Sequence, residues 1–78
     1  MLHIIPEGVD YLTPIQAATL EYIKTFIAQH RGSPTLATIA AEFGITTAAA
    51  QQRVLSLVKK GAVKYTSHRA YSSIEILI

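Results

Sequence analysis

The sequence contains no cysteine, which excludes disulfide bonds and thiolate metal ligands. Its three histidines, His3, His30 and His68, are far apart and have no acidic cluster beside them, so we expect neither a metal site nor a cofactor. The sequence also shows no evident nucleophile–base pair or pair of carboxylates, and we therefore expect no enzymatic activity.

Long hydrophobic runs are also missing from the sequence. None approaches the roughly 18 apolar residues that are needed to cross a membrane. The first residues lack the basic start and the apolar stretch that together form a signal peptide. From these two absences we expect a cytoplasmic protein that does not contact a membrane.

Charged residues are scarce, at 15% against about 25% in an average domain, whereas hydrophobic residues make up 50%. Because a 78-residue domain has much surface, part of this apolar excess should lie outside, where a partner subunit can cover it. The charge is also uneven, with a net −2 over residues 1–30 and +5 over residues 31–70. Such a basic half is typical of a nucleic-acid-binding surface, but an ordinary solvated face has the same pattern.

Start and stop signals predict a first helix over residues 14–30. Thr13 is a suitable N-cap, Pro14 suits the first helical position, and Gln16 completes a capping box. Apolar residues then recur at helical spacing, and Gly32 before Ser33-Pro34 is the expected stop.

Two further helices are predicted between residues 35 and 60. Thr35 caps a short helix that ends at Gly44, and Thr46 or Thr47 caps a helix that runs to about residue 60. In this third helix the apolar residues recur at i, i+4, i+7 and i+11, which is one face of a helix: Ala50, Val54, Leu57 and Gly61.

After Gly61 the apolar residues alternate with polar ones, which predicts a β-hairpin over about 62–76 with a basic tip at residues 67–70. Residues 1–12 form an N-terminal arm, in which Leu2-His3-Ile4-Ile5 is a possible short strand ending at Pro6. Residues 13–78 therefore constitute one mainly α domain with a small β-hairpin, a three-helix winged helix-turn-helix.

Two segments resemble the winged-helix repressors. They are residues 33–46 (SPTLATIAAEFGIT), which match the helix-turn-helix, and residues 54–63 (VLSLVKKGAV), which match the end of the recognition helix and the entry to the wing. The opening LTPIQ at 12–16 and the Pro34-Thr35 turn are most similar to the N-terminal domain of LexA-type repressors. The resemblance covers about residues 12–77 and implies a DNA-binding fold.

The sequence departs from the LexA pattern at several points. The Gly44–Leu57 spacing is one residue shorter, the wing is about one residue longer, and Thr38 replaces an acid that is usual on the second helix. The self-cleaving protease domain of that family is absent from these residues, so the resemblance implies no peptidase activity and no particular regulatory circuit.

The predicted recognition helix, at about 47–60, has an outward face without acidic residues. Glutamine can pair bidentately with adenine, alanine can contact the thymine methyl, and threonines at helix N-termini suit phosphates. Basic residues on the helix flank and in the wing can reach further phosphates, although Arg53 could instead pair with Glu42. The candidate DNA contacts are Thr35, Thr46, Thr47, Ala48, Gln51, Gln52, Arg53, Lys64, His68 and Arg69.

The predicted function is a sequence-specific transcriptional regulator that binds double-stranded DNA as a homodimer. A winged helix that contacts another protein and binds no DNA is the alternative, which the low charge favours. Leu55 and Val58 lie off the predicted apolar stripe. Together with the apolar chain ends they either form a subunit interface or widen the core against the N-terminal segment.

Overall fold

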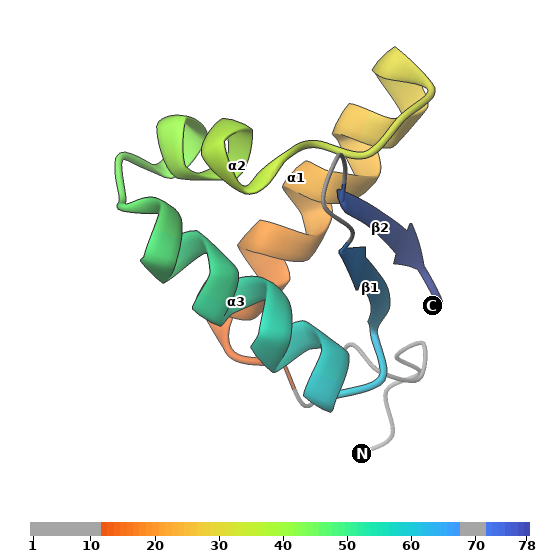
Figure 1. Ribbon diagram of the computed structural model, residues 1–78. Coiled ribbons are helices and arrows are strands. Elements are labelled where there is room, and N and C mark those ends of the chain that lie inside the picture. Colours follow the sequence, from red (N-terminus) through yellow and green to blue (C-terminus); the bar gives the residue numbers. More distant parts are fainter. Residues whose placement is uncertain (1–11, 68–71) are drawn as a thin grey trace.

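The computed structural model describes residues 12–67 and 72–78. Three helices precede an antiparallel hairpin (Figure 1), and the elements are α1 (Pro14–His30), α2 (Leu36–Phe43), α3 (Thr47–Lys59), β1 (Val63–Ser67) and β2 (Ser72–Ile76). The prediction of a mainly α winged helix-turn-helix is thereby confirmed. The predicted strand at residues 2–5 and the tip of the wing lie outside the described residues.

The first helix begins where the capping signals predicted. The Gln16 amide donates to Thr13 Oγ1 at 3.1 Å, and the Thr13 amide donates to Gln16 Oε1 at 3.0 Å. The predicted end of the helix at residue 30 is confirmed, but the residue with the left-handed backbone that ends it is Arg31, with φ 58°, and not Gly32. The Arg31 amide donates to the Ile27 carbonyl at 2.9 Å, so the chain turns one residue before Gly32.

The second and third helices form the expected helix-turn-helix. Gly44 ends α2 with φ 65°, a conformation that glycine adopts without strain. Thr46 rather than Thr47 caps α3, since Thr46 Oγ1 accepts from the Ala49 amide at 3.0 Å. The last residue of α3 is Lys59, one residue before the predicted end, and Lys60 is its C-cap.

The hairpin is joined to the end of α3 by backbone hydrogen bonds. The Ala62 amide donates to the Leu57 carbonyl and the Leu77 amide to the Ala62 carbonyl, both at 2.9 Å. In the register of the two strands Val63 pairs with Ile76 and Tyr65 with Ile74, so the inward-facing residues of both strands stand opposite each other.

All three helices and the hairpin contribute to one hydrophobic core. The α3 residues Ala50, Val54 and Leu57 are completely buried, as their spacing predicted, but Gly61 is exposed and does not extend this stripe. The other buried apolar residues of the core are Leu20, Ile23, Ile39, Ala40, Ala62, Val63 and Ile74. No helix within residues 12–67 and 72–78 is long and apolar enough to span a membrane.

Candidate nucleic-acid interface

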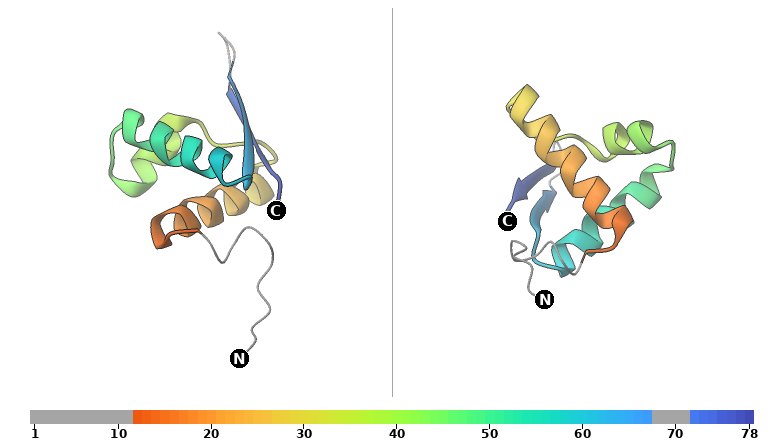
Figure 2. Two further views of the ribbon diagram at one scale, coloured as in Figure 1. Left: turned by 90° about the horizontal axis from the view of Figure 1, so that it is seen from below. Right: turned by 180° about the vertical axis from the view of Figure 1, so that it is seen from behind.

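The face of α3 opposite the buried stripe is exposed. Thr47, Ala48, Gln51 and Gln52 are all solvent-accessible, and the helix contains no acidic residue. Figure 2 shows α1 against one side of α3 and no described element over the other. The burial of Ala50, Val54 and Leu57 therefore leaves four of the predicted contacts on one free surface.

The hairpin lies beside this surface. In Figure 2, the ends of β1 and β2 that adjoin residues 68–71 extend on the side of α3 that faces away from α1. An exposed helix face flanked by a hairpin on the same side matches the arrangement of a recognition helix and its wing.

The threonines at the helix starts are confirmed as N-caps. Thr35 Oγ1 accepts from the Thr38 amide at 3.0 Å and lies 2.9 Å from Thr38 Oγ1. Thr46 caps α3 in the same way, and Thr47 occupies the first position of that helix. All three threonine side chains are exposed, and the N-termini of α2 and α3 direct their partial positive charge toward solvent near them.

Arg53 lies where α1, α2 and α3 meet, away from the outward face of α3. Its Nη1 donates to Thr19 Oγ1 at 3.4 Å, and its guanidinium stands 5.0 Å from the centre of the Phe43 ring. This cation–π contact holds a half-buried charge against the second helix. The structure thus gives Arg53 two intramolecular contacts that the prediction of a phosphate or a Glu42 partner did not include.

Thr19 is the residue of this junction that the sequence interpretation missed. It is completely buried, and its hydroxyl donates to the Ile15 carbonyl at 2.8 Å while it accepts from Arg53. A buried hydroxyl needs such partners, because an unsatisfied one costs about 1–3 kcal/mol. The sequence signal for its burial was its position, one residue before Leu20 and four before Ile23, inside the apolar face of α1.

Aromatic rings support the same junction from the side of α1. Tyr22 packs edge-on against Phe43, with 5.7 Å between ring centres, and at 6.0 Å from Phe26. Desolvation and the nearby Glu42 carboxylate both raise the pKa of the Tyr22 phenol above its ordinary value. These rings fix α2 on α1 and hold Phe43 beneath the Arg53 guanidinium.

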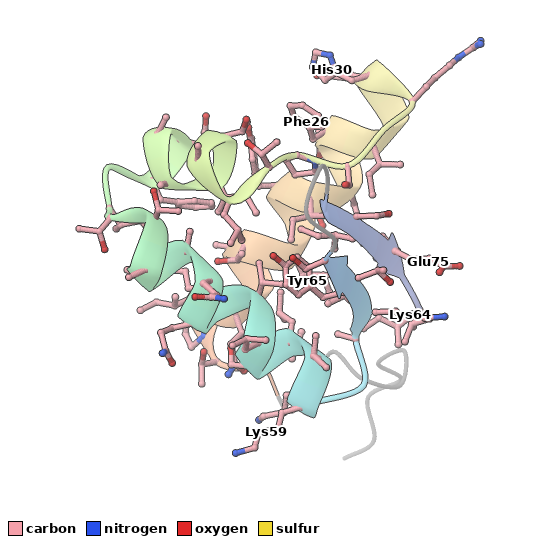
Figure 3. All side chains as sticks on the ribbon, in the orientation of Figure 1. Phe26, His30, Lys59, Lys64, Tyr65 and Glu75 are labelled. Atoms are coloured by element: carbon pink, nitrogen blue, oxygen red, sulfur yellow. The ribbon has the colours of Figure 1, made fainter. Side chains whose placement is uncertain are left out.

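The wing residues are only partly described. Lys64 is exposed and stands opposite Glu75 in the strand register, where unlike charges stabilise a strand pair. Figure 3 shows both side chains on the side of the hairpin away from the helices, while Tyr65 points inward. Lys64 is therefore not brought together with the α3 contacts, and His68 and Arg69 lie outside the described residues.

The helix-turn-helix, its free third helix and the adjoining hairpin define the class of winged helix-turn-helix domains. The family model described as LexA DNA binding domain matches residues 9–72. The chain therefore belongs to the LexA DNA-binding domain family.

Three relatives illustrate how far the similarity extends. The chain is 36% identical to LexA repressor 2 of Pseudomonas putida over 62 residues, which is 78% of the chain and 31% of the relative. It is 41% identical to the LexA repressor of Polaromonas naphthalenivorans over 64 residues, 81% of the chain and 27% of the relative. The LexA repressor of Pseudomonas aeruginosa is 41% identical over 56 residues, 70% of the chain and 28% of the relative. The chain thus spans less than a third of the length of these relatives.

Proposed function

We propose that this protein is a transcriptional repressor that binds double-stranded DNA sequence-specifically, with α3 in the major groove. The observation that carries the proposal is the exposed, acid-free face of α3 in a chain of the LexA DNA-binding family. An acid-free face approaches phosphates without repulsion, and the small side chain of Ala48 permits close approach to the bases.

The contacts divide into base readout and backbone positioning. Gln51 and Gln52 pair with base edges, and Ala48 contacts a thymine methyl. Phosphates are held at the helix starts, on the flank of α3 and along the wing at residues 62–76, by Thr35, Thr46, Thr47, Arg53, Lys64, His68 and Arg69. Phosphate contact at Arg53 uses donors of the guanidinium other than the one bonded to Thr19.

In vitro selection from a random duplex library tests the proposal first, and we expect recovery of an inverted repeat. On the recovered site, Gln51→Ala and Gln52→Ala should each reduce the free-energy difference between specific and random binding by about 1–3 kcal/mol per lost bidentate contact. The matched control is Gln29→Ala, because Gln29 is an exposed glutamine on α1.

The outcomes separate the two candidate functions. An unchanged ratio in both α3 variants would show that this helix does not read the sequence. Absence of any salt-sensitive binding to duplex DNA would favour the alternative, a protein-contact module, for which the exposed Leu55 and Val58 provide an apolar surface.

A further inference from the structure

Leu55 is a large apolar side chain on the outward face of α3. It is 43% exposed, although the buried stripe lies on the opposite side of the same helix. Together with Gln52, Ser56 and Lys59 it lines an open hollow of about 260 Å³. The lining therefore combines one apolar side chain with polar side chains and a cation, on the surface that carries the proposed base contacts.

The spacing of Leu55 places it in line with the residues of α3 that are proposed to contact bases. Ala48, Gln51, Gln52 and Leu55 follow one another at i, i+3, i+4 and i+7, which is the spacing of the base-contacting residues on a homeodomain recognition helix. At about 100° per residue, these positions fall within an arc of about 100°. Val58 is 39% exposed but lies on the flank of this arc.

The chemistry of the major groove identifies the group that a leucine can contact there. Among the four bases, only thymine presents an apolar group in this groove, its C5-methyl, whereas the other edges present donors and acceptors that a leucine would leave unpaired. Lys59, one turn after Leu55, supplies a cation for the phosphate beside such a base.

A second copy of the chain fits this hollow less well. A two-fold contact centred on Leu55 would place the Lys59 of each copy within the interface, and α3 contains no acid to pair with it. Duplex DNA supplies both an apolar methyl group for Leu55 and negative charge for Lys59.

We propose that Leu55 is a specificity-determining residue that contacts the C5-methyl group of a thymine in the bound site. The inference rests on the proposed function, because it requires α3 to lie in the major groove. It predicts a second thymine in the bound site, at a base pair other than the one that Ala48 contacts.

Replacement of single thymines by deoxyuridine tests this contact, because it removes only the methyl group. On the selected site, the wild-type protein should lose about fourfold in affinity at the thymine that Leu55 contacts, as expected for one methyl-sized group returned to water. Leu55→Ala should bind thymine and deoxyuridine equally at that position while retaining the methyl dependence at the Ala48 position. Fluorescence anisotropy with labelled duplexes measures each dissociation constant.

Val58→Ala is the matched control, because it removes an apolar side chain of similar exposure from the same helix. It should retain the wild-type methyl dependence at every thymine. Both variants should unfold like the wild type, since the substituted side chains lie outside the buried core.

Three results would overturn the inference. One is methyl dependence in Leu55→Ala that equals the wild type at every thymine, with sequence preference retained. A second is a change of mass in sedimentation with both Leu55→Ala and Val58→Ala, which would make the surface a contact between copies. Failure to select any preferred sequence would overturn the proposed function, and this inference with it, and is distinguishable from the first two.

Discussion

At the residue scale, Arg31 shows how a helix end can depart from its strongest sequence signal. Its φ of 58° is in the left-handed region, while Gly32, which follows directly, is outside it. The left-handed conformation costs an L-residue about 1–2 kcal/mol. This cost is borne next to a glycine because the Arg31 amide, not that of Gly32, bonds to the Ile27 carbonyl.

We therefore predict that Arg31→Gly stabilises the protein by about 0.5–1 kcal/mol, since relief of strain exceeds the added entropy of the unfolded chain. The control is Gly32→Ala, whose new Cβ would meet only the His30 carbonyl oxygen at 4.0 Å and should be tolerated. Urea unfolding followed by circular dichroism gives both free energies. A loss of stability in Gly32→Ala larger than 1 kcal/mol, with none gained in Arg31→Gly, would contradict the assignment of the helix end.

At the element scale, the position of α3 depends on contacts between residues far apart in sequence. Arg53 bonds to Thr19, 34 positions earlier, and lies over the ring of Phe43 on α2. One side chain of α3 thus contacts both other helices. These contacts orient α3 relative to α1 and α2.

The hairpin gives the element-scale prediction. If the wing follows phosphates, Arg69→Ala should weaken binding to all duplexes by a similar factor and reduce the slope of log K against log salt by about one unit. Titrations at several salt concentrations measure this slope. Lys24→Ala is the matched control, because it removes one cation from α1, which packs on the side of α3 away from the proposed DNA surface, and should leave the slope unchanged. An unchanged slope in Arg69→Ala would remove the wing from the contact surface.

At the scale of the whole molecule, the small number of cations is an argument that the protein binds DNA as a homodimer. Six basic residues lie between positions 31 and 70, and counterion release increases with the number of phosphates neutralised. Two copies double these contacts and cover apolar surface. We propose that the chain ends form the interface between the two copies. Among the described residues β2 pairs only with β1.

The structure decides which residue tests this interface. Ile76 pairs with Val63 and packs against the core, so Ile76→Lys would damage the fold, whereas Leu77 is 54% exposed. We predict that the wild type sediments as a dimer and that Leu77→Lys is a folded monomer. Sedimentation equilibrium measures both, with circular dichroism as the check on folding. A wild-type mass that stays at 8.5 kDa up to high micromolar concentration would contradict the dimer, but not the DNA-binding fold.

The sequence by itself determined the elements and their order. Thr13 with Gln16, Thr35 and Gly44 mark helix ends through hydrogen bonds and backbone angles that involve residues at most four positions apart. The buried stripe of α3 follows equally from its spacing, because the period of a helix fixes which residues share a face. Local geometry of this kind can be predicted without knowledge of the fold.

The tertiary structure alone decided what each face contacts. Arg53 is on the flank of α3 by its spacing, but only the packing of α1 and α2 places Thr19 and Phe43 beside it. Leu55 was an apolar residue with two possible explanations until the exposed side of α3 was known. The physical reason is that spacing fixes the direction of a side chain relative to its own helix, whereas the residues that meet it depend on how the elements pack together.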